Sequence, residues 1–327
     1  MSHTFPGFFD LQVNGFAGVD FNAPDLHPDQ VDTAIGHLRL TGVTRFLPTL
    51  ITAPLDAFAR NARLLSRTRD AAIAGVHMEG PYLSPDDGPR GAHPRAHLMA
   101  ASVGDFERRQ EAAGGRIVLV TLAPEVPGAM PLIEYLVTRG VRVALGHTAA
   151  SPDQLEAAIA AGATLATHLG NGCAQMLPRH PNGIWTLLAA DRVTASFIVD
   201  GHHLPAATVK AMIRAKTGAR SILVTDATAA AGCPPGTYWI GSVRGELDAT
   251  GRVSLPGTPY LAGSALTMPE AISNTVRFTD LAVSDAAALA SAVPARVIGM
   301  PASGRVLADW DDEKRRLTVV RVDDSPC

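Results

Sequence analysis

The chain has little of several features that define other protein classes. Its 327 residues include three cysteines and 5% aromatic residues, and no uninterrupted apolar run reaches the roughly 18 residues of a membrane span. Cys173, Cys233 and Cys327 show no CxxC spacing, so we expect a reduced, cytoplasmic protein whose thiols take no part in the chemistry. Residues 1–6 have neither the basic start nor the apolar run of a signal peptide.

An excess of charge of either sign is also absent. The chain carries 28 Lys and Arg residues against 31 Asp and Glu residues, a formal net charge of -3. This balance gives no electrostatic attraction for nucleic acid or for an anionic membrane, so we expect neither as a partner. What is present, 46% hydrophobic and 18% charged residues, is the composition of a globular enzyme with a large core.

Short apolar runs alternate with amphipathic or alanine-rich stretches along most of the chain. Eight strands are predicted, at 8–13, 43–50, 72–78, 116–122, 141–145, 164–167, 195–199 and 221–225. Helices are predicted between them, at 28–40, 54–66, 127–138, 151–161 and 205–217, several with a proline in the first turn. Eight alternations predict a (β/α)8 TIM-like barrel, with an open doubly wound sheet as the alternative. We favour the barrel because polar residues end several different strands.

The pattern changes after the eighth strand. We predict one barrel domain over residues 1–302, with a β-hairpin inserted at about 236–258. Its strands would be 238–243 and 252–255 around a turn at 248–251. Two further helices are predicted at 269–278 and 284–293, and residues 303–327 would hold the last strand, 315–322, of a reduced small β-domain.

Four of the predicted strands end in a side chain that can bind a metal or move a proton. Glu79, His147, His168 and Asp226 each follow a separate apolar run. A carboxylate in apolar surroundings needs a partner, and one carboxylate with two histidines can hold a divalent ion with room for water. Each residue taken singly could be an ordinary polar strand end. Together they predict a metal bound by Glu79, His147 and His168, with Asp226 as a neighbouring acid/base.

The first predicted strand adds a polar face. Asp10, Gln12 and Asn14 alternate along it and therefore point to one side. Amides are poor zinc ligands, so we predict one metal ion rather than two, with Gln12 and Asn14 beside it. His77 shares a strand face with Glu79, and we expect it to make a buried hydrogen bond rather than bind the metal.

The chain also resembles a known family. The motifs PGFFDLQVNG, HMEGPYLSP, GAH, TLAPE, LGHT, ATHLGN, DGHH, LVTDATAAAG and LAGSALTM follow one another in unbroken order. This set is similar to the N-acetylglucosamine-6-phosphate deacetylases of the amidohydrolase superfamily. The resemblance implies a metal-dependent hydrolase that releases acetate from N-acetylglucosamine-6-phosphate or a close N-acetyl amino-sugar phosphate. It also implies a homodimer.

The resemblance implies a role for each matching residue at the catalytic centre. Glu79, His147 and His168 match the metal ligands, which bind zinc or, as the alternative, iron. Asp226 matches the catalytic aspartate. His93, in the Gly-Ala-His segment, matches the histidine that hydrogen-bonds the acetamide carbonyl.

Other matches concern the sugar phosphate. Asn171 and Gly172 match the loop whose backbone amides help to hold it. His203 and Arg179 match the histidine and arginine on the phosphate side, and in the family that arginine comes from the neighbouring subunit of a dimer. Arg179 lies in a loop, where the alternative is an ordinary solvated side chain.

The match also has limits. Gln12 and Asn14 match the members that bind a single metal ion, where the superfamily's usual His-x-His pair is absent. The loop after His168 lacks the family's usual aromatic residue and Asn-Ala-Met run, and the stretch between Glu79 and His93 is longer than usual. Family members also carry strands ahead of the first barrel strand, so we expect the small β-domain to be reduced.

Two other functions are compatible with the sequence. One is an amidohydrolase that acts on an unphosphorylated N-acyl sugar or N-acyl amino acid. The other is a catalytically silent homologue that only binds a sugar phosphate. Because every metal and acid/base position is retained, the sequence argues against the silent homologue.

Overall fold

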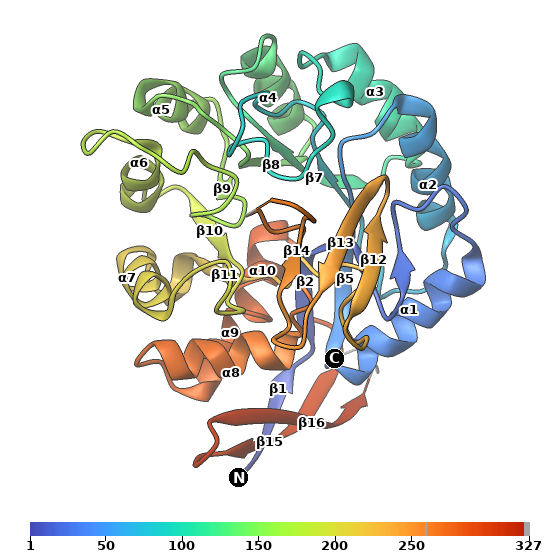
Figure 1. Ribbon diagram of the computed structural model, residues 1–327, viewed down its shortest axis with the longest axis vertical. Helices are drawn as coiled ribbons and strands as arrows, with labels where there is room; N and C mark the ends of the chain where they lie inside the picture. Colours follow the sequence, from blue (N-terminus) through green and yellow to red (C-terminus); the bar gives the residue numbers. More distant parts are fainter. Residues whose placement is uncertain (259, 324–327) are drawn as a thin grey trace.

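Eight parallel strands form one sheet that curls into a barrel. The structure is a computed structural model that describes residues 1–258 and 260–323. The sheet has the order β11-β10-β9-β8-β7-β6-β5-β2, and Figure 1 shows the helices arranged around it. The strands are β2 (Phe8–Val13), β5 (Val43–Leu50), β6 (Val76–Glu79), β7 (Ile117–Leu122), β8 (Arg142–Leu145), β9 (Leu165–Ala166), β10 (Thr194–Phe197) and β11 (Ser221–Leu223). The predicted (β/α)8 barrel is therefore confirmed.

Several strand boundaries differ from the prediction, most at the start of β6. β6 begins at Val76 rather than at residue 72 and includes Glu79. β11 ends at Leu223 rather than at residue 225, because the Thr225 N–H donates to the buried carboxylate of Asp10 instead of to a neighbouring strand.

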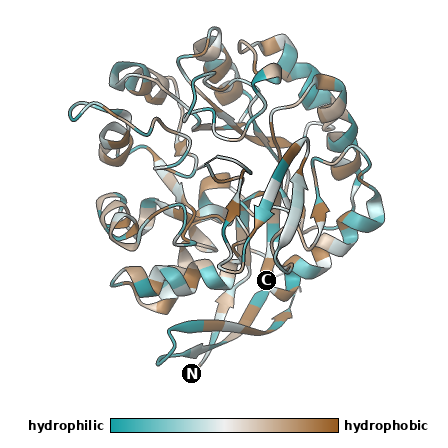
Figure 2. Ribbon diagram, viewed as in Figure 1, coloured by the Kyte–Doolittle hydropathy of each residue, from teal (hydrophilic) through white to brown (hydrophobic). Residues whose placement is uncertain are grey.

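The helices bury one face against the barrel. They are α1 (Pro28–Leu40), α2 (Leu55–Arg67), α3 (Val103–Ala112), α4 (Ala129–Thr138), α5 (Pro152–Ala160), α6 (Gly183–Ala189), α7 (Ala206–Lys216), α8 (Met268–Phe278), α9 (Val283–Ala288) and α10 (Ala292–Ile298), with short 3-10 turns at Arg95–His97 and Gly218–Arg220. In α1 the buried residues Val31, Ala34, Ile35 and Leu38 have the spacing of one helical face. Figure 2 shows hydrophilic residues on the outer faces of the helices. Within the described part of the chain, no helix has the length and apolarity needed to cross a membrane.

Local sequence fixes where individual helices begin. The Ser151 hydroxyl accepts the Gln154 N–H at 3.3 Å, and the Gln154 side chain accepts the Ser151 N–H at 2.9 Å. This reciprocal capping box, with Pro152 in the first turn, starts α5 where the sequence predicts a helix.

The prediction of one continuous helix over 284–293 is wrong. Residues 289–291 separate α9 from α10. The Leu289 carbonyl accepts the N–H of Leu223 on β11 at 3.0 Å, and the Ala290 carbonyl accepts the N–H of Phe9 on β2 at 2.8 Å. The helix breaks because these carbonyls satisfy the donors of the two edge strands of the barrel.

A small antiparallel sheet lies over the mouth of the barrel. It contains β12 (Gly236–Ile240), β13 (Val243–Leu247) and β14 (Val253–Ser254), and Figure 1 shows it crossing in front of the barrel strands. The prediction of a single strand over 238–243 is wrong, because the chain turns at Gly241, which has a φ of 56° and donates its N–H to the Asp20 carboxylate at 2.6 Å. A second hairpin, β3 (Gly15–Phe16) with β4 (Val19–Asp20), follows β2.

The two ends of the chain meet in a separate sheet. β1 (Ser2–Pro6), β15 (Arg305–Asp311) and β16 (Arg316–Asp323) are antiparallel in the order β1-β15-β16, and they lie at the bottom of Figure 1. β1 adds residues from the predicted barrel domain to this sheet. The division into 1–302 and 303–327 stays a prediction, and residues 324–327, with Cys327, lie outside the described residues.

Candidate active site

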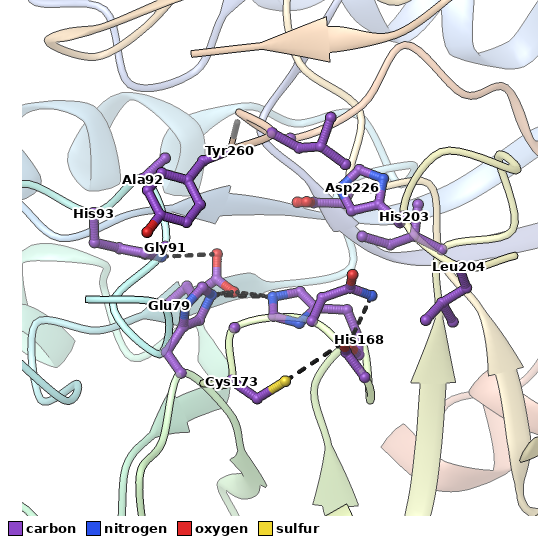
Figure 3. A pocket seen from close by; sticks show the side chains of 18 of the residues that line it. Glu79, Gly91, Ala92, His93, His168, Cys173, His203, Leu204, Asp226 and Tyr260 are labelled. Carbon is purple, nitrogen blue, oxygen red and sulfur yellow. Dashed lines mark hydrogen bonds and ion pairs between the residues drawn. The ribbon is translucent and has the colours of Figure 1, made fainter. Parts of the chain in front are cut away.

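A cavity of about 590 Å³ opens at the C-terminal ends of the barrel strands. Polar side chains line its barrel side, and Ile240, Val243 and Tyr260 line the side toward the β12–β14 sheet. In Figure 3 Glu79 and His93 lie at one end of the view, Asp226 and His203 lie at the other, and His168 lies between them. The four predicted strand ends therefore meet in one cavity.

The three predicted metal ligands converge. Glu79 Oε1 lies 3.2 Å from Nε2 of His147 and 3.2 Å from Nε2 of His168, and the two ring nitrogens lie 3.0 Å apart. Zinc holds nitrogen and oxygen ligands at about 2.0–2.1 Å, so two ligand atoms of a tetrahedral site lie about 3.3 Å apart. The measured separations are close to the edges of such a tetrahedron. One carboxylate and two imidazoles therefore fit a divalent metal ion.

Neighbouring groups orient these ligands. His147 Nδ1 donates to the Pro89 carbonyl at 2.9 Å, which makes Nε2 the nitrogen available to bind a metal ion. Gln12 Nε2 donates to Glu79 Oε1 at 2.9 Å. A Cβ on Gly172 would lie 2.8 Å from His147 Nδ1, so only glycine allows this loop to approach the ring.

The electrostatics match a cation site. Burial alone would raise the pKa of Glu79, but hydrogen bonds and charge from His147 and His168 outweigh it and hold that pKa well below its ordinary value. Burial lowers the pKa of His147, and Glu79 outweighs burial and raises it. Glu79 is therefore ionised and attracts positive charge to this point of the cavity.

Asp226 follows β11 and faces the same cavity. Asn14 Nδ2 donates to Asp226 Oδ1 at 2.7 Å. Burial, and then the negative charge of Glu79, raise the pKa of Asp226 to about 6. A carboxylate with this pKa is ionised at neutral pH and is a stronger base than an exposed aspartate.

His93 is buried beside the ligands. Its Nδ1 lies 2.9 Å from Thr52 Oγ1 and its Nε2 lies 3.8 Å from Glu79 Oε2. Burial, and then His147, lower the pKa of His93 to about 3, so the ring is neutral. In the tautomer where Nδ1 accepts a hydrogen bond from the Thr52 hydroxyl, Nε2 carries the proton and can donate to a ligand in the cavity.

Two predicted sugar-phosphate residues are oriented from within this chain. His203 lines the cavity, and its Nδ1 donates to Asp200 Oδ2 at 2.6 Å. The backbone N–H groups of His202 and His203 donate to Asp200 Oδ1, each at 2.8 Å. Asn171 lines the cavity as well, and its Nδ2 donates to the His168 carbonyl at 3.2 Å.

Arg179 does not join them. It is exposed and is not among the residues that line the cavity. The same loop and the following helix expose Met176 (90%) and Trp185 (55%). Within its own chain Arg179 therefore makes no part of the site, and its predicted role in a neighbouring subunit stays a prediction.

His77 has the role that we expected. Its Nδ1 lies 3.1 Å from the Leu11 carbonyl, and its Nε2 lies 2.8 Å from Thr121 Oγ1. Burial lowers the pKa of His77 to about 4, so it is a neutral hydrogen-bonding group in the barrel interior.

Sequence reasoning missed several residues of the site. Asp200 could have been found, because Asp-Gly directly after a strand is typical of a turn closed by the aspartate side chain. Nothing in the sequence marks Thr52 or Tyr260. Cys173 also lines the cavity, but burial raises the pKa of its thiol, which leaves it a weak nucleophile.

Comparisons with known proteins agree with this geometry. Residues 4–310 match the model of the Amidohydrolase family. The N-acetylglucosamine-6-phosphate deacetylase of Bos taurus is 35% identical over 310 residues, covering 90% of this chain and 74% of that protein. The N-acetylgalactosamine-6-phosphate deacetylase of Escherichia coli is 35% identical over 301 residues, covering 90% and 78%. A Mycobacterium smegmatis N-acetyl-D-glucosamine-6-phosphate deacetylase mutant, solved with N-acetyl-D-glucosamine-6-phosphate, is similar with a TM-score of 0.90 and 34% identity, covering 98% of this chain and 86% of that one.

Proposed function

The chain belongs to the amidohydrolase family, and we propose that it hydrolyses the acetamide of N-acetylglucosamine-6-phosphate. The products are acetate and the amino-sugar phosphate. The observation that carries the proposal is the meeting of Glu79, His147, His168 and Asp226 in one cavity at the ends of different barrel strands. Similar proteins named for this reaction support the substrate.

The protein's own residues account for the proton movements of this reaction. A divalent metal ion held by Glu79, His147 and His168 would supply Lewis-acid chemistry, which activates water at neutral pH and polarises a carbonyl. Asp226 accepts the proton of the attacking water and delivers it to the leaving amine nitrogen. His93 Nε2–H donates to the acetamide carbonyl oxygen and stabilises its developing negative charge.

We infer one metal ion per chain, with zinc preferred over iron. Two nitrogen donors and one oxygen donor suit zinc, and Gln12 and Asn14 stand where a second pair of histidines would be needed for another ion. Elemental analysis of protein purified without chelators should give a metal-to-chain ratio near one. Two tightly held ions per chain would contradict this inference.

One substrate series tests the function. Acetate release is measured with metal-replete protein on N-acetylglucosamine-6-phosphate, N-acetylgalactosamine-6-phosphate, N-acetylglucosamine and an N-acetyl amino acid. We expect the first to be hydrolysed fastest and the last two hardly at all. A preference for the galactosamine compound would change the sugar, and a preference for an unphosphorylated compound would overturn the role of the phosphate. Binding without acetate release from any of the four would identify a silent homologue.

We infer that His203 and the loop at Asn171 and Gly172 hold the phosphate side of the sugar. Arg179 would complete the site from the other subunit of a homodimer, and its exposure in its own chain supports this arrangement. We also infer a cytoplasmic location, which the small number of cysteines without CxxC spacing supports.

Arg179→Ala tests the phosphate contact. An arginine fork binds phosphate oxygens in pairs, so its loss should weaken transition-state binding of the phosphorylated substrate by about 1.5–3 kcal/mol. kcat/KM should hardly change for the unphosphorylated sugar. Arg192→Ala, at another exposed arginine, is the matched control. Equal losses on both sugars, or none on either, would show that this loop does not recognise phosphate.

A further inference from the structure

Where its two edge strands meet, the barrel sheet is closed by side chains together with two backbone bonds, from the Asn14 and Gly15 N–H groups to the Ala227 carbonyl at 2.7 and 3.1 Å. β11 and β2 end the order of the eight-stranded sheet, and between them the described residues form an isolated bridge, Val13 with Ala227, rather than a ladder. The fully buried carboxylate of Asp10, on β2, lies in this gap. Its Oδ2 accepts the Thr225 hydroxyl at 2.5 Å, and its Oδ1 accepts the Thr225 N–H at 3.3 Å.

A second segment bonds to Thr225 and to the next residue, Asp226. The Ser264 hydroxyl donates to the Thr225 carbonyl at 2.5 Å, and the Ser264 N–H donates to the Asp226 carbonyl at 3.0 Å. A Cβ on Gly263 would lie 2.4 Å from Thr228 Cγ2 and 3.2 Å from the Asp226 carbonyl oxygen. Only glycine therefore allows this segment, which is the LAGS motif of the sequence, to come so close.

The residue held between these contacts has an unfavourable backbone conformation. Asp226 has a φ of 50°, in the left-handed region that residues other than glycine rarely occupy. Such a conformation persists only where the surrounding structure enforces it. Ser264 bonds the peptide groups on both sides of Asp226, and Asp10 holds the N–H and hydroxyl of the preceding residue, Thr225. Asn14 holds the Asp226 carboxylate.

We propose that Asp10 and Ser264 are positioning residues that hold Asp226 in this left-handed conformation and so direct its carboxylate into the cavity. Together with Thr225 they form what we call the aspartate clamp. Neither Asp10 nor Ser264 lines the cavity, so each acts through Asp226. The inference rests on the proposed function, in which Asp226 moves the proton.

The kinetic test separates positioning from simple structural support. Asp10→Asn and Ser264→Ala should each lower kcat about 10- to 100-fold, the size expected when a catalytic group is displaced by about 1 Å. KM and the metal content should stay within about twofold, because neither residue touches the substrate or the metal ligands. A loss of metal instead would mean that Asp10 acts through Gln12 and Glu79, and would overturn the proposal.

Two buried residues away from the site serve as controls. Asp105 accepts bonds from Tyr82 and Arg109, and the Ser291 hydroxyl donates to a helix carbonyl at 2.7 Å. Asp105→Asn and Ser291→Ala should lower Tm without lowering kcat. If the clamp variants behave in the same way, Asp10 and Ser264 support only the fold.

A thermal test needs no activity and therefore separates a failure of the clamp from a failure of the proposed function. At a position with enforced positive φ, glycine is favoured over alanine, so Asp226→Gly should have a Tm about 2 °C above that of Asp226→Ala. Adding Asp10→Asn to both variants lets the backbone relax, and the difference should vanish. If the difference persists in both Asp10→Asn and Ser264→Ala backgrounds, the clamp does not enforce the conformation of Asp226.

Discussion

The site has two halves that the barrel supports in different ways. The ligand half consists of Glu79, which ends β6, and of His147 and His168, which follow β8 and β9. A continuous parallel ladder through β7 joins these strands. The seam half consists of Asp226 and Asn14, at the edge strands β11 and β2, where side chains replace most of the ladder. The metal site thus rests on a continuous backbone ladder. The proton-transfer group rests on a few backbone bonds, such as those from the Asn14 and Gly15 N–H groups to the Ala227 carbonyl, and on side chains that can be replaced.

This difference in support separates the residues needed for metal binding from those needed for proton transfer. Changes in the ligand half should remove the metal, and changes in the seam half should remove proton transfer while the metal stays bound. Gln12 connects the two halves, because it lies on the edge strand β2 and its side chain donates to Glu79 in the ligand half. Four substitutions test this contrast, and their expected effects decrease from Glu79→Gln to Asp20→Asn.

Glu79→Gln should abolish both metal binding and acetate release. The amide has a similar volume but carries no negative charge, so two histidines alone would have to hold a divalent cation in a buried site. Metal content after dialysis and acetate release measure the two effects. Glu107→Gln, at an exposed glutamate bonded to Tyr135, should change neither. Retention of the metal by Glu79→Gln would remove the distinction between the halves.

Asp226→Asn should lower kcat by about 10²–10⁴ because it removes the proton acceptor. Asparagine tolerates a positive φ almost as well as aspartate, so the backbone and the bound metal should stay. Steady-state kinetics and elemental analysis of the same preparation check both points. If this variant keeps near-normal activity, another group moves the proton.

Gln12→Leu should weaken metal binding by about 10- to 100-fold, the usual effect of losing a hydrogen bond to a metal ligand. Its effect on kcat of the metal-saturated protein should be smaller than that of Asp226→Asn. Titration against a chelator gives the affinity. An unchanged affinity would mean that the two halves are independent.

The smallest effect concerns Asp20, which links the β3–β4 hairpin that follows β2 to the turn at Gly241. Burial, only partly offset by hydrogen bonds from Asn22 and Gly241, raises the pKa of Asp20 from 3.8 to about 7. A raised pKa in the folded state means that the native protein binds the proton more tightly. The stability from this group is therefore complete below about pH 4 and is lost as the pH rises toward 7.

Asp20→Asn should remove that contribution to the pH dependence. Thermal unfolding of both proteins between pH 4 and pH 8 should show a flatter Tm profile for the variant over pH 4–7. kcat should change little, since Asp20 does not line the cavity. Parallel profiles for the two proteins would show that Asp20 does not titrate in this range.

The sequence predicts the ligand half better than the seam half. Glu79, His147 and His168 each follow an apolar run, and a barrel brings the ends of such runs together, so local pattern and topology suffice. The roles of Asp10 and Ser264 depend on contacts between residues 215 and 39 positions apart in the chain. The local sequence pattern cannot predict such contacts. A polar residue in an alternating pattern looks the same whether its side chain faces a ligand or another strand.

The errors in the fold have the same origin. The break between α9 and α10 occurs in a stretch of helix-forming residues, and it exists because the carbonyls at 289 and 290 are needed by distant edge strands. Likewise the turn at Gly241 is anchored by Asp20. In each case a tertiary hydrogen bond overrides the local preference of the backbone.

The pairing of β1 with β15 has a consequence for synthesis of the protein. β1 finds its partner only in the last part of the chain. β2 pairs early with β5 on one edge, but its other edge bonds to late residues, as the Phe9 N–H does to the Ala290 carbonyl. At about 5–20 residues per second, translation of the intervening chain takes on the order of tens of seconds. During that time the edge of β2 is open to pairing with other nascent chains. We therefore expect the growing polypeptide to need protection by a chaperone until its C-terminal strands emerge.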